Sequence, residues 1–232
     1  MGRLPIVALD GPAGVGKTTL ALRLARTLGV ARLDTGAMYR CLALRLGEGF
    51  PSLSDEEISR RCGAVRFNLD GDREDGALLC DDRPVGDEVR TEEVGALASR
   101  IATLPIVREC MKAAQRRIGE LHPLVAEGRD MGEVVFPDAA FKFFLDATPE
   151  IRAARRLADL RARGDESADL ARLTEQLRRR DDRDRNRAEA PLRPAPGAEI
   201  VDTSRLDVDG VLALLCDRIR AGGGASLFPR LR

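Results

Sequence analysis

The sequence predicts a three-layer α/β fold, in which a parallel sheet carries helices on both of its faces. Short apolar segments typical of buried strands alternate with longer segments whose apolar residues recur at helical spacing. The first apolar segment, residues 6–9, leads directly into a glycine-rich loop and then into an amphipathic stretch that Gly29 should end. Because 232 residues can bury one sizeable core, we expect a single domain over residues 1–222.

The later elements continue this alternation. We expect strands near residues 31–34, 124–127, 141–145 and 199–202, each followed by a helix or a turn into one. Two shorter strands near 65–69 and 77–80 are joined by a turn-rich stretch, which indicates a small inserted subdomain at about residues 60–90. Residues 54–57 form a capping-box pattern that should open a helix. The glycine-rich residues 223–232 are expected to form a flexible tail.

The composition argues against several classes of protein. Hydrophobic residues make up 44% and charged residues 33%, and no apolar run is long enough to span a membrane. The N-terminus does not resemble a signal peptide, so we expect a cytoplasmic protein with no membrane partner. Zero net charge and few aromatic residues argue against a nucleic-acid partner. Five isolated cysteines and a single histidine argue against disulfides, zinc sites and Ser-His-Asp hydrolysis.

The glycine-rich loop is the strongest chemical signal in the chain. It matches GxxxxGK[ST], a phosphate-binding loop whose backbone N–H groups point at phosphate oxygens. Lysine is rare in this sequence, so a chance match has a probability of roughly two in a thousand. The motif and its context make the predicted fold one of the P-loop NTPase type. The residues expected to bind the nucleoside triphosphate are Gly11, Pro12, Ala13, Gly14, Val15, Gly16, Lys17, Thr18 and Thr19.

Two residues of this loop have specific expected roles. Lys17 should reach the β- and γ-phosphates, and the Thr18 hydroxyl should serve as a ligand of Mg²⁺. A phosphate-binding loop alone fits a GTPase, an ATPase or a small-molecule kinase. The absence of an Asn-Lys-x-Asp sequence counts against a GTPase. The many arginines then become candidates for holding an anionic second substrate.

Three further stretches carry a resemblance to a known family. Residues 34–40 (DTGAMYR), 127–132 (EGRDMG) and 180–187 (RDDRDRNR) resemble the signature stretches of bacterial cytidylate kinases, and they follow the loop in the same order. The resemblance implies transfer of the γ-phosphate of ATP to CMP or dCMP, with Mg²⁺. It also implies that the insert binds the monophosphate, and that a mobile lid covers about residues 152–168. Candidate lid arginines are Arg155, Arg156, Arg161 and Arg163.

Residues that follow the second and third core strands are candidates for the acceptor site. Thr35 and Arg40 follow one strand, at the sheet edge where α/β proteins bind ligands, and the resemblance assigns them to the monophosphate. Arg129 and Asp130 follow another strand, and the resemblance implies that they read the edge of cytosine. A carboxylate can accept from the exocyclic amine of cytosine, whereas uracil presents a carbonyl there. The simpler alternatives are a helix cap for Thr35 and a buried ion pair for Arg129 and Asp130.

The remaining candidates lie on expected helices. Arg180, Asp184 and Arg187 recur at i, i+4 and i+7 on one helix face, which could bind phosphate and a ribose hydroxyl or could simply face solvent. The resemblance favours the first interpretation and adds Ser99 and Arg108 as substrate contacts, against the alternative of a surface helix. It thereby implies catalytic roles for Lys17, Arg129, Arg180 and Arg187.

Two other functions remain open from the sequence. The enzyme could phosphorylate another small acceptor, or the chain could be a nucleotide-dependent regulator that binds RNA through its arginine-rich helix. We expect a monomer.

Overall fold

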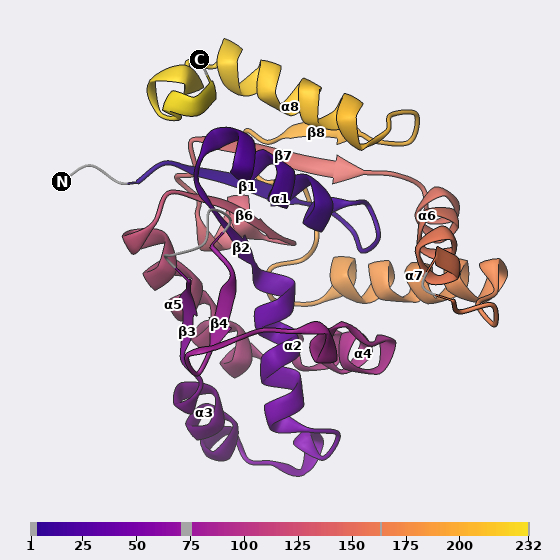
Figure 1. Ribbon diagram of the computed structural model, residues 1–232. Coiled ribbons are helices and arrows are strands. Elements are labelled where there is room, and N and C mark those ends of the chain that lie inside the picture. The colour runs from indigo at the N-terminus through magenta and orange to yellow at the C-terminus, as the bar shows by residue number, and fades with distance from the viewer. Residues whose placement is uncertain (1–3, 71–75, 163, 232) are drawn as a thin grey trace.

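The protein is built around a five-stranded parallel sheet, as predicted (Figure 1). The computed structural model describes residues 4–70, 76–162 and 164–231. The strand order is β2-β6-β1-β7-β8, so β1 lies at the centre. The strands are β1 (Ile6–Asp10), β2 (Ala31–Asp34), β6 (Leu124–Gly128), β7 (Phe141–Asp146) and β8 (Glu199–Asp202).

Helices cover both faces of this sheet, because successive side chains of a buried strand point to opposite sides. Val7 and Leu9 of β1 pack with α1 (Lys17–Leu28) and α8 (Val208–Ala221), whereas Ala8 packs with α2 (Thr35–Leu46) and α5 (Pro105–Leu121). Both faces of the strand are therefore apolar, as is typical of a parallel sheet. The other long helices are α4 (Glu92–Ile101), α6 (Pro149–Ala162) and α7 (Leu170–Asn186).

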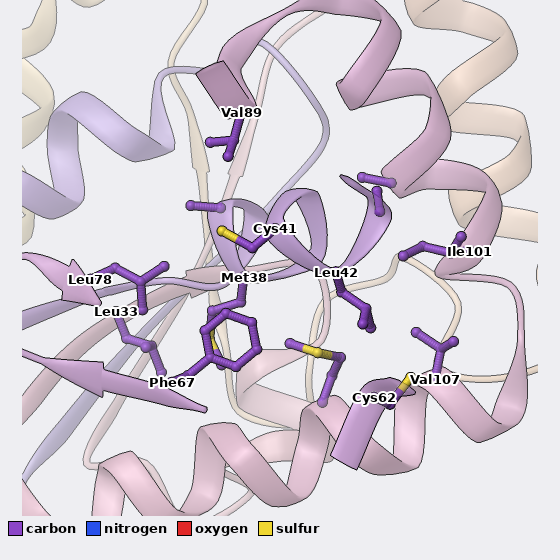
Figure 2. Packing of buried hydrophobic residues seen from close by; sticks show 14 of the residues in the cluster. Leu33, Met38, Cys41, Leu42, Cys62, Phe67, Leu78, Val89, Ile101 and Val107 are labelled. Carbon is purple, nitrogen blue, oxygen red and sulfur yellow. The ribbon is translucent and has the colours of Figure 1, made fainter. Parts of the chain in front are cut away.

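The expected insert has its own small antiparallel sheet, β3 (Phe67–Leu69), β4 (Leu78–Cys80) and β5 (Arg83–Pro84). Helix α3 (Asp55–Ala64) precedes it, and the Ser54 hydroxyl accepts a hydrogen bond from Glu57 N at 3.3 Å, as the capping pattern predicted. Most of the expected turn between β3 and β4 lies outside the described residues. Phe67 and Leu78 pack into the same core as Leu33, Met38 and Leu42, so the insert shares the core of the main fold (Figure 2).

The C-terminal residues differ from the expectation of a flexible tail at 223–232. Short 3₁₀ turns at Gly224–Ser226 and Pro229–Leu231 fold the chain back onto α1. Phe228 is fully buried and lies against the ring of Phe141, with 6.3 Å between the ring centroids. The glycine content suggested flexibility, but the two large apolar side chains Phe228 and Leu231 cover part of the core and fix the segment.

None of the helices in the described part of the chain has both the length and the apolar character that crossing a membrane requires.

Candidate active site

The carboxyl ends of three neighbouring strands bring the candidate residues together. In the sheet register, Asp34 of β2 lies beside Glu127 of β6, and Gly128 of β6 lies beside Asp10 of β1. The chain leaves these strands into the phosphate loop, the start of α2 and the Arg129–Asp130 segment, all at one edge. A cleft of about 670 Å³ opens there, a size suited to a small-molecule ligand.

Most of the predicted site residues line this cleft. Those that do are Ala13, Gly14, Val15, Gly16, Lys17, Thr18, Thr19, Thr35, Arg40, Ser99, Arg129, Asp130, Arg180, Asp184 and Arg187. The other three do not line it: Gly11 and Pro12 are buried, and Arg108 is buried and paired with Asp130.

The glycines of the loop are required by its backbone. Gly11, Gly14 and Gly16 all have positive φ, at 146°, 75° and 96°. A Cβ on Gly11 would lie 2.2 Å from the carbonyl oxygen of Leu145, so no larger residue fits there. Gly16 caps α1 without a side-chain hydrogen bond, which leaves the first N–H groups of this helix for an anion.

Lys17 is the buried member of a cluster of cations that also includes the half-buried Arg129 and Arg180. Its ammonium donates to the carbonyl oxygens of Gly11 at 2.8 Å and Pro12 at 2.6 Å. Burial and the nearby Arg129 hold the pKa of Lys17 well below its ordinary value. Burial and the same Arg129 lower the pKa of Arg180 to about 10. These groups repel one another, so the cluster is suited to a polyanion that binds between them.

Asp184 offsets part of this positive charge. It accepts a hydrogen bond from Arg129 Nε at 3.0 Å. Burial acts to raise the pKa of Asp184, but Arg129, Arg180 and Arg187 outweigh it, and the pKa lies below its usual range. The expected helix face of Arg180, Asp184 and Arg187 is therefore directed into the cleft, and not into solvent.

A second cluster surrounds Asp130. Arg108 hydrogen-bonds one oxygen of this carboxylate, and Arg187 Nη2 lies 3.9 Å from the other. Burial raises the pKa of the neighbouring Tyr39 to about 12. Ser99 and Arg108 are both buried, which excludes their placement on a surface helix.

The structure excludes the simpler alternative of a buried ion pair between Arg129 and Asp130. They do not pair with each other, and their partners belong to different clusters: Asp184 for Arg129 and Arg108 for Asp130. The backbone between these adjacent residues directs their side chains apart. Arg129 lies with Lys17 and Arg180 beside the phosphate loop, whereas Arg108 lies beside Asp130.

Thr35 and Arg40 both line the cleft, and each makes one hydrogen bond to a backbone carbonyl. The Thr35 hydroxyl donates to the carbonyl oxygen of Glu127 at 2.6 Å, and Asp34 caps α2 by accepting from Ala37 N at 2.9 Å. Asp34, and not Thr35, is therefore the residue that caps this helix. Arg40 Nη1 donates to the carbonyl oxygen of Val89 at 3.1 Å, and Arg40 lines the cleft.

Buried polar atoms without partners mark the places where a ligand could bind. Among the described residues, four buried side-chain atoms lack a hydrogen bond: Ser99 Oγ, Gln115 Nε2, Arg180 Nε and Arg187 Nη2. Three of these four belong to the cleft. Since an unpaired buried polar group costs about 1–3 kcal/mol, these three are suited to hydrogen bonds with a bound molecule.

Two of the four candidate lid arginines line the cleft. Arg155 and Arg156 line the cleft, where Arg155 Nη1 donates to Thr203 Oγ1 at 3.1 Å and Arg156 pairs with Glu92. Arg161 is exposed outside the cleft, and Arg163 lies outside the described residues.

Several cleft residues were not predicted from the sequence. Tyr39 and Glu127 lie inside the stretches that carry the family resemblance, which was the signal available for them. Thr203 directly follows β8, so the rule that ligands bind at the carboxyl ends of strands could have found it. Arg90 and Glu92 had no local signal.

Comparison with known proteins agrees with this geometry. The family model "Cytidylate kinase" matches residues 7–221. The chain belongs to the cytidylate kinase family. A cytidylate kinase from Nitratidesulfovibrio vulgaris is 58% identical over 221 residues, which cover 95% of each chain. One from Oleidesulfovibrio alaskensis is 53% identical and covers 93% of this chain and 98% of its own.

Among solved structures, a shikimate kinase from Bacteroides thetaiotaomicron aligns with a TM-score of 0.47 at 15% identity. The alignment covers 93% of this chain and 98% of that one.

Proposed function

We propose that this protein transfers the γ-phosphate of ATP to CMP or dCMP, giving ADP and CDP or dCDP. The observation that carries the proposal is the cleft itself, in which a phosphate loop faces two arginine clusters with three unpartnered buried polar atoms. Membership of the cytidylate kinase family supports the choice of acceptor.

The donor half of the reaction belongs to the phosphate loop. Phosphoryl transfer needs positioning and charge neutralisation more than covalent chemistry. The loop N–H groups and Lys17 would hold the triphosphate, and Arg129 and Arg180 would face the charge that spreads over the transferred group. An oxygen of the monophosphate attacks the γ-phosphorus directly, and the bond from phosphorus to the β,γ-bridging oxygen breaks.

The acceptor half belongs to the residues on β6, α2, α4, α5 and α7. Thr35 and Arg40 would bind the monophosphate, and Asp184 would accept from a ribose hydroxyl. Asp130, held by Arg108, would accept from the exocyclic amine of cytosine, while Ser99 and Arg187 offer unpartnered atoms to the same substrate. The insert and the lid would close over the cleft and exclude water from it.

The donor set beside the loop fits Mg²⁺. The Thr18 hydroxyl donates to Glu127 Oε2 at 2.8 Å, and Asp34 lies close enough to Glu127 to raise the pKa of that buried glutamate. Burial and Asp34 together bring this pKa to about 7. Hydroxyl and carboxylate oxygens are the ligands that Mg²⁺ prefers, and Thr18 would bind it directly. When bound, Mg²⁺ would neutralise charge on the β- and γ-phosphates. No cluster of three or more His, Cys, Asp or Glu suited to a metal occurs among the described residues.

The alternative of an RNA-binding regulator loses two of its candidate contacts, because Arg180 and Arg187 are directed into the cleft. The other arginines of the run, Arg178, Arg179, Arg183 and Arg185, are exposed, and two of them pair with glutamates: Arg178 with Glu150 and Arg179 with Glu175. We propose that the protein acts as a monomer.

A coupled assay of ADP release against a panel of nucleoside monophosphates tests the proposal. We expect strong stimulation by CMP and dCMP and weaker stimulation by UMP. Stimulation by AMP or shikimate in place of CMP would assign a different acceptor. ADP release that no acceptor stimulates would contradict a kinase function.

A further inference from the structure

We propose that Asp10 is a positioning residue for acceptor specificity: it caps the π-helical turn Met131–Val135 in place of Asp130, and thereby leaves the Asp130 carboxylate available to the base. This inference rests on the proposed function, because it concerns how the cleft selects its acceptor.

The contacts of Asp10 are specific and fully buried. It is the last residue of β1, and its side chain is 3% exposed. One carboxylate oxygen accepts from Met131 N at 2.8 Å, and the other accepts from Gly132 N at 2.8 Å. Asp10, which lies on a strand distant in the sequence, therefore uses both carboxylate oxygens to accept from the first two N–H groups of this helical turn.

These contacts replace the ordinary cap of that turn. Asp130 occupies its N-cap position, where an aspartate commonly accepts a hydrogen bond from the second or third N–H group that follows. Here the Asp130 side chain makes no such bond. It is directed instead to Arg108, with Arg187 Nη2 at 3.9 Å. Because Asp10 already accepts from Gly132 N, one of the two N–H groups that an N-cap aspartate would bind, we infer that Asp130 keeps its orientation toward the cleft.

The burial of Asp10 is energetically unfavourable for its own charge, which suggests a role beyond folding. Burial raises its pKa to about 6, although the two backbone hydrogen bonds and Lys17 oppose that rise; Asp130 adds to it. An apolar residue would avoid this cost but could not accept the two bonds. The position also connects the two halves of the site, because Asp10 directly precedes Gly11 of the phosphate loop.

The test compares Asp10→Asn with the wild type on CMP and UMP. An asparagine keeps the shape of the side chain but offers one acceptor oxygen, so Asp130 can turn back to cap its own helix. We expect KM for CMP to rise at least about tenfold and the CMP/UMP ratio of kcat/KM to fall by a similar factor. KM for ATP should change by less than about threefold. Thermal unfolding checks that the variant folds.

A double-mutant cycle distinguishes positioning from a general loss of stability. If Asp10 acts through Asp130, then Asp10→Asn should alter the CMP/UMP ratio little in an Asp130→Ala background. Additive losses of selectivity, or an unchanged ratio in Asp10→Asn, would overturn the inference. Ser54→Ala, which removes the cap of α3 outside the cleft, is the matched control and should leave the ratio unchanged.

Two further results bear on this inference: a variant that does not fold, and a wild type that does not prefer CMP. If Asp10→Asn does not fold, Asp10→Ser replaces it, because one short hydroxyl cannot substitute for two carboxylate oxygens; a wild-type ratio would again overturn the inference. If the wild type itself does not prefer CMP, the proposed function fails, and this inference fails with it. A wild type that prefers CMP, with variants that keep the preference, contradicts the role of Asp10 alone.

Discussion

At the scale of single residues, the site depends on a few side chains whose burial makes them sensitive to substitution. Lys17 is buried, bound to two loop carbonyls and surrounded by arginines. Asp130 is buried beside Arg108 and Arg187. In both cases the protein holds a charge where solvent cannot reorganise around it, so that its effect on a ligand is strong.

Lys17→Ala should lower kcat by at least about 100-fold, because the transferring phosphoryl group loses its closest ammonium. The far-UV circular dichroism spectrum should stay unchanged. Lys112→Ala is the matched control, since that lysine pairs with Glu109 outside the cleft and its loss should leave kcat within about twofold. Near wild-type turnover in Lys17→Ala would contradict the assignment of the phosphate loop.

Asp130→Ala should narrow the preference for CMP over UMP. The carboxylate that accepts from the amine of cytosine is then missing, and the repulsion that it imposes on the carbonyl of uracil is lost as well. We expect the CMP/UMP ratio of kcat/KM to fall by about tenfold or more. An unchanged ratio in this variant would assign base recognition to another residue.

At the scale of elements, helices α6 and α7 are joined to the phosphate loop by one buried arginine. Arg152 is 1% exposed and pairs with both carboxylate oxygens of Asp181. Its Nε donates to the carbonyl oxygen of Ala147 at 2.8 Å, and its Nη1 donates to that of Ala13 at 2.8 Å. The base of the expected lid is therefore attached to the loop that binds the donor.

Arg152→Met should lower the free energy of unfolding by about 3–5 kcal/mol, because it leaves a buried carboxylate and two carbonyl groups without their partner. Urea denaturation measures this loss. Arg179→Met is the control, because Arg179 is 75% exposed and pairs with Glu175, which lies one turn earlier in α7. Removal of that pair should cost less than about 0.5 kcal/mol. Equal losses in the two variants would contradict a special role for the buried pair.

At the scale of the whole molecule, the C-terminal residues complete the core on the face of α1 and α8. Phe228 and Leu231 are almost fully buried, and Arg220 Nε donates to the carbonyl oxygen of Leu231 at 3.1 Å. The layer of helices on this face therefore extends beyond the last long helix.

Phe228→Ala should lower the free energy of unfolding by about 3 kcal/mol or more, as large-to-small changes in a core do. Leu227→Ala provides the comparison, because Leu227, the residue before Phe228, is 45% exposed and should contribute less than about 1 kcal/mol. Thermal or urea unfolding separates the two. Similar small effects would mean that the segment contributes little to the core.

Local sequence patterns are enough to predict the succession of strands and helices along the chain, the phosphate loop and somewhat fewer than half of the residues that line the cleft. These signals are local: Gly11 to Thr18 form a contiguous motif, Ser54 caps the helix that it precedes, and Arg180, Asp184 and Arg187 share a face because of helical spacing. The resemblance of three short stretches to cytidylate kinases predicted the acceptor, CMP or dCMP.

Which side chains meet in the site depends on tertiary packing. Adjacent residues Arg129 and Asp130 take partners from α7 and α5, and Asp10 caps a turn that lies more than a hundred residues away in the chain. The glycine-rich C-terminus became part of the core because α1 and Phe141 offered apolar surface to Phe228 and Leu231. Pairing between distant segments depends on the packing of the sheet and its helices, which no local pattern encodes.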